Sequence, residues 1–160
     1  MSLEQKINNL ETDLHIMGTL VLESLVSAVR ALEDKDIAKA SVVIDKDDEI
    51  DDAYMKIDQD WFELMATEQP VASDLRLSTS ILQASLHLER LGDLSVYLGK
   101  TTHEIHDLPI PESLHKIVIE MGDMVIDMAS SALESLKNRD AELALSTARK
   151  DELINSLYNK

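Results

Sequence analysis

The amino-acid sequence predicts an all-α protein, and three observations carry this prediction. Apolar residues make up 44% of the chain, and they recur at alternating spacings of three and four positions, which is typical of amphipathic helices. Only four Gly and three Pro interrupt the 160 residues, so helix formers dominate. A long helix followed by a second helix occurs twice along the chain. We therefore expect tandem three-helix bundles, the second lacking its third helix in this sequence.

The first bundle is predicted from apolar seams and from the residues that interrupt them. One long helix ends at "EDKD" (33–36), where Asp36 can cap a second helix. The second helix is predicted to run without a break to "ATEQP" (66–70). It ends there because a proline disfavours helix in the residue before it. The third helix covers about 71–103 and carries two apolar seams, so we expect it to be covered from two sides.

The second bundle begins after the one obvious linker. "HDLPIPES" (106–113) contains two of the three prolines. A helix over about 113–137 and another from residue 140 follow, divided by "NRD". We place the first three-helix unit at 1–107 and the first two helices of a second unit at 108–160.

An internal repeat supports this division. Shifting the chain by 104 positions without a gap aligns residues 17–56 with 121–160 and gives 13 identities in 40 positions, where average composition gives about two or three. The match continues through the turn "DKD"/"NRD". No counterpart of residues 71–103 follows, so either the chain is a fragment or another molecule supplies the third helix.

The charge balance limits the partners. With 15 basic and 31 acidic residues the formal charge is −16, which repels phosphate backbones and argues against nucleic acid. Metal cations or basic protein surfaces are better partners. The absence of cysteine removes disulfides and thiolate chemistry. With no signal peptide or apolar run of membrane-spanning length in view, we expect a cytoplasmic protein without membrane insertion.

Two pairs of carboxylates interrupt apolar seams. Glu89 and Asp93 lie one turn apart on the third helix, and Asp47 and Asp51 do so on the second. Four converging carboxylates raise one another's pKa unless a cation lies among them, and oxygen ligands suit hard divalent ions. The alternative is a solvated acidic face with Arg90 and Lys46 as counter-ions.

The remaining motifs give little chemistry. In the second copy Asp151 is retained, whereas Asn155 replaces the second acid. Glu112 and His115 form one Glu-x-x-His, but di-iron bundles need this motif twice. A carboxylate-bridged metal-binding bundle with oxidase or storage activity is thus the alternative interpretation rather than the main one. No nucleophile motif or phosphate loop occurs, so we do not expect an enzyme.

The acidic motifs resemble those of a known family. "PVASDLR" (70–76) and "LERLGD" (88–93) on one helix, with "DKDDEID" (45–51) before them and "KDELIN" (150–155) in the second copy, closely resemble the PhoU family of bacterial phosphate uptake. The resemblance covers essentially the whole chain.

The resemblance implies tandem three-helix bundles with spectrin-like packing and metal-binding acidic motifs. It places metal ligands at Asp47, Asp51, Glu89, Asp93 and Asp151, for a divalent or trivalent ion such as Fe, Zn, Mg or Mn. It further implies a cytoplasmic, usually dimeric regulator of phosphate homeostasis that contacts the ATPase subunit of the phosphate ABC transporter and the phosphate-sensing histidine kinase, exerting negative regulation. Tyr97 departs from the family pattern, in which a polar Asn is common one turn beyond the last acid.

Overall fold

Helices account for nearly all of the part of the chain that the structure describes, residues 1–159 of a computed structural model. No β-strand occurs in that range, so the all-α prediction is confirmed. Lys160, which pairs with Lys56 in the sequence repeat, lies outside the described residues. The helices are α1 (Leu3–Asp34), α2 (Ile37–Asp45), α3 (Asp47–Glu68), α4 (Ala72–Ile105), α5 (Glu112–Asn138), α6 (Ala141–Arg149) and α7 (Asp151–Tyr158).

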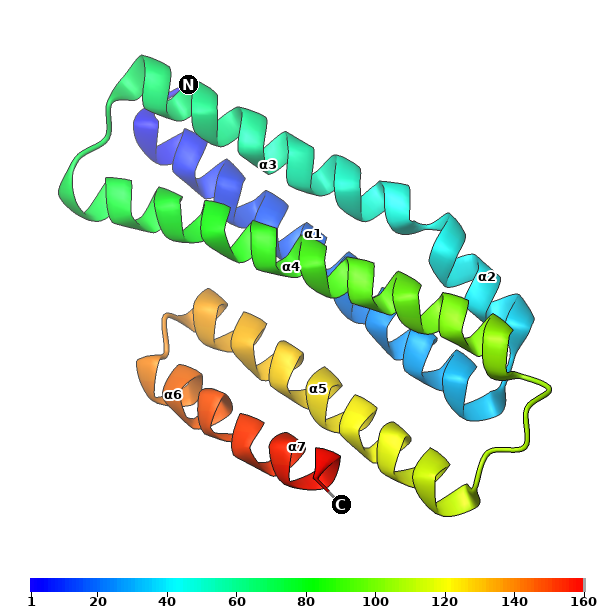
Figure 1. Cartoon of the computed structure of the whole chain (residues 1–160). Coiled ribbons are helices and arrows are strands. Elements are labelled where there is room, and N and C mark those ends of the chain that lie inside the picture. Colours follow the sequence, from blue (N-terminus) through cyan, green and yellow to red (C-terminus); the bar gives the residue numbers. More distant parts are fainter. Residues whose placement is uncertain (160) are drawn as a thin grey trace.

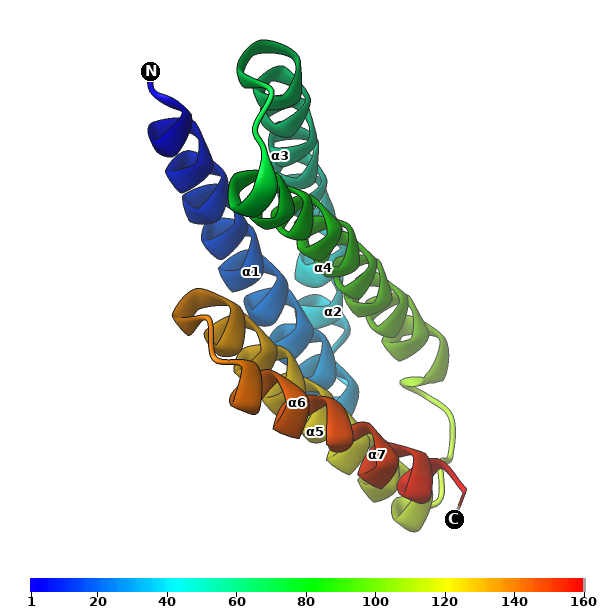
Figure 2. The same cartoon turned by 90° about the vertical axis from the view of Figure 1, so that its left-hand side faces the viewer.

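The helices form two unequal groups. α4 packs against α1, α2 and α3, which gives a three-helix bundle because α2 and α3 follow one line (Figure 1). α5 packs along α1, and α6 and α7 cover α5 in turn (Figure 2). The core lies in the first bundle, since amphipathic helices are stabilised mainly by burying their apolar faces. Its fully buried members include Leu10, Leu14, Met17, Val21, Ile57, Leu64 and Ile81.

The predicted second helix is in fact two helices, and this part of the prediction is wrong. The chain breaks at Lys46, whose φ of −92° and ψ of 0° end α2. Its N–H still donates to the carbonyl of Val42 at 3.2 Å. α3 then begins with Asp47, Asp48 and Glu49, and three acids in a first turn are favoured by the positive end of the helix dipole. Because of the break, the acidic segment forms the first turn of α3.

The turns after α1 and α5 have the same local structure. Lys35 and Arg139, 104 positions apart, both end their helices in the left-handed conformation with a φ of 53°. In each case the next residue caps the following helix: the Asp36 side chain accepts from the N–H of Lys39 at 2.9 Å, and Asp140 does the same one repeat later. The sequence repeat is thus matched by repeated backbone geometry.

The contact between α1 and α5 is itself repeated. A Cβ atom on Gly18 would lie 2.7 Å from Cδ2 of Leu133, and one on Gly122 would lie 2.9 Å from Cγ1 of Val29. These two contacts exchange under the 104-residue shift, which pairs Gly18 with Gly122 and Val29 with Leu133. The two helices therefore meet around a local pseudo-two-fold axis, and the glycines permit their close approach.

α1 is long and apolar enough, by length and composition alone, to cross a membrane, which differs from the expectation of no such run. In the structure 44% of that apolar stretch is buried inside the protein. Its buried apolar residues form the core together with residues of α3 and α4. A core helix that is largely buried inside a bundle can meet the same criteria of length and composition.

Candidate metal centre

The two acidic pairs lie beside a close contact between α3 and α4. A Cβ atom on Gly92 would lie 3.1 Å from Cγ2 of the buried Ile50. Gly92 immediately precedes Asp93, and Ile50 immediately precedes Asp51. Because this contact fixes the register between the two helices, the carboxylates of α3 lie beside those of α4. We call Asp47, Asp51, Glu89 and Asp93 the acidic strip.

The carboxylates of the acidic strip act on one another. Burial raises the pKa of Asp47 above its usual value, and the negative charges of Asp51 and Asp93 raise it further. Burial also raises the pKa of Glu89, with further contributions from Asp93, Asp51 and Asp47. In both residues part of the increase in pKa comes from carboxylates of the opposite helix, so the two pairs lie near enough to repel each other.

The strip lacks a compensating partner within contact distance. Oδ1 of Asp47 is buried and has no hydrogen-bond partner, although buried polar atoms are nearly always paired. Among residues 1–159, none of the four carboxylates has a Lys, Arg or His nitrogen within 4.0 Å. Lys100 lowers the pKa of Asp47 and Arg90 lowers that of Glu89, but both act from a distance.

The acidic strip has the right type of ligand atom for a hard cation, but its side chains are not arranged around one position. Carboxylate oxygens are the ligands that Mg²⁺ and Mn²⁺ prefer, and a cation would satisfy the unpaired Asp47 oxygen. Within the described residues, however, no three His, Asp or Glu side chains are arranged as a ligand group. A bound ion would therefore need rotamer changes of exposed acids such as Asp51 and Asp93.

Asp151, the fifth predicted ligand, lies apart from the strip. Its Oδ2 accepts a hydrogen bond from Nδ2 of Asn155 at 3.0 Å. It borders an apolar cavity lined by Leu91 of α4, Val125 of α5 and Ile154 of α7. The residue that replaced the second acid thus satisfies the first one.

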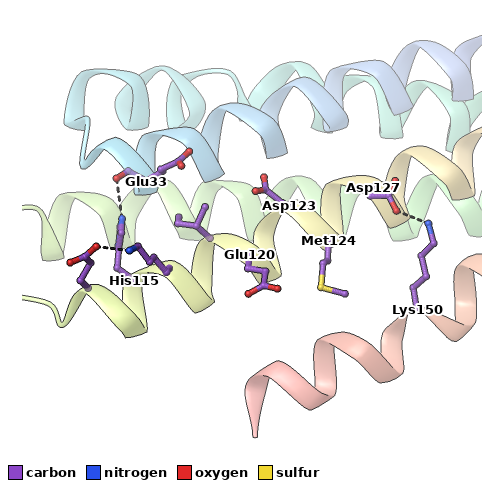
Figure 3. A pocket seen from close by; sticks show the side chains of 10 residues that line it. Glu33, His115, Glu120, Asp123, Met124, Asp127 and Lys150 are labelled. Carbon is purple, nitrogen blue, oxygen red and sulfur yellow. Dashed lines mark hydrogen bonds and ion pairs between the residues drawn. The ribbon is translucent and has the colours of Figure 1, made fainter. Parts of the chain in front are cut away.

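A second group of acids lines a cleft of about 760 Å³ between α1, α5 and Lys150 (Figure 3). Four of the five acids that line it, all except Glu120, have a cationic partner, unlike those of the strip: for example, Lys150 pairs with Asp127 at 2.5 Å, and Arg30 pairs with Asp123. The comparison between the cleft and the strip makes the strip the stronger cation candidate.

The Glu-x-x-His motif lies in the same cleft but is not arranged as a ligand pair. Glu112 pairs with Lys116 at 2.5 Å and is the first residue of α5. Nε2 of His115 contacts the backbone oxygen of Glu33 at 3.0 Å (Figure 3). In the first turn of α5 the Glu112 carboxylate is favoured by the positive end of the helix dipole.

Sequence reasoning missed Lys100 and chose Lys46 as a counter-ion instead. Lys100 follows Asp93 by seven residues, a spacing that returns to the same helix face, so the signal was present in the sequence. Tyr97 lies between them and is exposed.

These observations define a class of protein: an all-helical bundle with an internally repeated unit and an acidic strip between two helices, without a nucleophile motif. Sequence and structure comparisons name the family. The PhoU domain matches residues 14–102 and again 118–160, so the chain belongs to the PhoU family.

Individual relatives agree. A "Phosphate-specific transport system accessory protein PhoU homolog" of Clostridium acetobutylicum is 32% identical over 98% of this chain and 72% of the relative. One of Streptococcus pneumoniae is 33% identical over 96% of this chain and 70% of the relative.

Solved structures extend the similarity to the fold. The crystal structure of PhoU from Pseudomonas aeruginosa superimposes with a TM-score of 0.95 and 31% identity, over 99% of this chain and 76% of that protein. PhoU from S. pneumoniae gives a TM-score of 0.90 at 30% identity. The predicted family and the helical-bundle fold are therefore confirmed.

Proposed function

We propose that this protein is an accessory regulator of phosphate transport that acts through protein contacts in the cytoplasm rather than through catalysis. The names of the relatives, phosphate-specific transport system accessory proteins, carry this proposal. Its partners are the ATPase subunit of a phosphate ABC transporter and a phosphate-sensing histidine kinase. Through them it restrains phosphate uptake and keeps the phosphate-starvation response off while phosphate is plentiful.

Co-purification tests the regulatory contacts. The purified protein at micromolar concentration is mixed with each tagged partner from the same organism, and retention is measured at physiological salt. Retention by the ATPase subunit or the kinase supports the proposal. Failure to bind either partner, with circular dichroism showing a folded helical protein, contradicts it.

We also propose that the acidic strip binds a metal ion as a structural or sensing element. The unpaired, buried Oδ1 of Asp47 together with the mutual repulsion of the strip supports this proposal. The ligands would be Asp47, Asp51, Glu89 and Asp93, with Fe, Zn, Mg or Mn as candidate ions, and Asp151 would contribute a weaker second position. A bound cation would neutralise the strip and allow α3 and α4 to approach without electrostatic cost.

Calorimetric titration with Mn²⁺ or Zn²⁺ tests the metal proposal. Asp93→Asn removes one charge at nearly constant shape, so we expect cation affinity to fall about tenfold or more, the loss typical even of groups that only support a metal ligand. The control is Glu142→Gln, which removes an exposed acid of α6. Equal affinities of the two variants would place any bound ion outside the strip.

We propose in addition that the protein is a homodimer. α5 to α7 expose large apolar side chains, including Leu114, Leu145 and Leu153, and exposed apolar surface favours association. Sedimentation equilibrium tests this directly. A monomer at 50 to 100 micromolar would contradict it.

A further inference from the structure

α3 carries a stripe of exposed residues that mixes acidic and apolar side chains. Asp51, Met55, Asp58 and Phe62 recur every three or four positions, so they share one helix face. Met55 is 66% exposed, and Phe62, the single phenylalanine of the chain, is 71% exposed. A protein with so few aromatic residues places its one Phe in water rather than in its core.

α4 carries a matching stripe. Leu75, Leu82 and Leu86 share one face with Glu89 and Asp93 by the same spacing. Leu75 is 41% and Leu86 37% exposed. The stripe is apolar at the start of α4 and acidic further along.

The two stripes run side by side with their chemistry aligned. α3 and α4 run in opposite directions (Figure 1), and their acidic ends are neighbours, since Gly92, next to Asp93, lies against Ile50, next to Asp51. Phe62 lies eleven residues from Asp51, and Leu82 lies eleven residues from Asp93, about 16 Å along each helix. The apolar ends therefore lie level as well, toward the α3–α4 loop.

We propose that this α3–α4 face docks an amphipathic helix of a partner protein, with apolar side chains on Met55, Phe62 and Leu86 and with Lys or Arg on Asp51, Glu89 and Asp93. Charge complementarity argues for this occupant: the acidic end has no cation in contact among the described residues, and the apolar end offers large exposed side chains. From Leu75 to Asp93 the face measures about 27 Å, the length of five helical turns.

The docked helix and the proposed cation use the same carboxylates, and this second part rests on the proposed metal site. Two ligands that need the same unpaired charges weaken each other's binding by the same factor. The cation-loaded protein therefore has lower affinity for the basic helix than the cation-free protein. Partner contact and cation occupancy are thereby coupled on one surface.

Fluorescence anisotropy with a designed peptide tests the docking. The labelled peptide has 18 residues, Leu on one face of its first half and Lys on the same face of its second half; a sequence-reversed peptide covers the opposite direction, and a third has Glu in place of Lys. In EDTA we expect micromolar binding of at least one Lys peptide and none of the Glu peptide. Equal binding of Lys and Glu peptides, or no binding of either Lys peptide, overturns the proposal.

Variants locate the binding face. Phe62→Ser should weaken the peptide about tenfold, since it removes a large apolar contact. Asp93→Asn should weaken it about two- to fivefold and reduce its salt dependence. The control is Val26→Ser, an exposed apolar residue of α1, which should bind as wild type. If Phe62→Ser and Asp93→Asn also bind as wild type, the peptide lies elsewhere and the proposal fails.

Repeating the measurement at saturating Mn²⁺ separates the two proposals. Weaker peptide binding in Mn²⁺, by the same factor that bound peptide weakens Mn²⁺, supports the coupling. Peptide affinity unchanged by a cation that calorimetry shows to be bound leaves docking intact and removes the coupling. Intact cation binding with no peptide bound in EDTA removes the docking and leaves the metal proposal.

Discussion

Met17 and Met121 occupy the same position in the two sequence copies, yet their surroundings differ. Met17 on α1 has no exposed surface, whereas Met121 on α5 is only partly buried. The same holds for Val21 and its counterpart Val125. The difference is α4, which covers α1 together with α2 and α3 and has no counterpart against α5 within the described residues.

This comparison separates two things that an apolar pattern encodes. The spacing of apolar residues fixes which face of a helix is apolar, and this is equal in the two copies. Burial depends on whether another element covers that face. Similar helices therefore contribute unequally to stability, because the hydrophobic contribution follows the area removed from water.

The largest expected effect comes from truncating the two methionines. Met17→Ala should lower the free energy of unfolding by about 2–4 kcal/mol, as for buried side chains whose removal leaves a cavity. Met121→Ala should cost about 1 kcal/mol or less, because its surroundings already admit water. Urea denaturation followed by circular dichroism measures both. Equal losses would show that the α5 face is as well covered in solution as the α1 face.

A smaller effect is expected at the glycines between α1 and α5. A Cβ atom on Gly122 would meet Val29, which is 2% exposed and β-branched, whereas one on Gly18 would meet the end of the partly buried Leu133. Overpacking costs about 1–3 kcal/mol, and replacing Gly by Ala within a helix gains about 1 kcal/mol. We expect Gly122→Ala to destabilise by about 1 kcal/mol and Gly18→Ala to be nearly neutral.

Thermal unfolding of these two variants measures the asymmetry of the pseudo-two-fold contact. Because the same substitution is made at the same position of each copy, helix propensity cancels in the comparison. A Gly18→Ala variant less stable than Gly122→Ala would mean that Leu133 is held more rigidly than Val29.

The sequence predicted much of this fold because its signals are local. Asp36 was expected to cap the second helix, and its side chain does accept from the N–H of Lys39. Pro70 ends α3 as expected, with Glu68 as its last helical residue. The break at Lys46 was missed because apolar spacing continues through it, and only the acidic run after it signals a new N-terminus.

The acidic strip was partly predictable. Spacing alone placed Glu89 and Asp93 on one face, but it could not show that Gly92 lets Ile50 approach and so brings the second pair level. Phe62 lies outside the apolar seam, on a face that it shares with Asp51 and Asp58, so its exposure could have been predicted from the helical spacing. Contacts between helices, unlike caps and turns, depend on residues distant in sequence.

The smallest expected effect concerns the charge of Asp47. Its counterpart in the second copy, Asp151, accepts a hydrogen bond from Asn155, whereas Asp47 faces other carboxylates. Burial and the neighbouring carboxylates raise the pKa of Asp47 above 3.8, so the folded state binds this proton more tightly than the unfolded state. The charged form therefore lowers the free energy of unfolding above the folded pKa, and this cost disappears as the pH falls toward 3.8.

Asp47→Asn should accordingly stabilise the protein by about 0.5 kcal/mol at pH 7 in EDTA, a value kept small because the strip is partly solvated. The gain over wild type should shrink as the pH falls through the raised pKa toward 3.8. The control is the exposed Glu49→Gln, which loses the same kind of favourable interaction with the start of α3 without removing a charge that raises the pKa of Asp47. A pH-independent difference, or equal behaviour of the two variants, would show that repulsion within the strip does not reach Asp47 in solution.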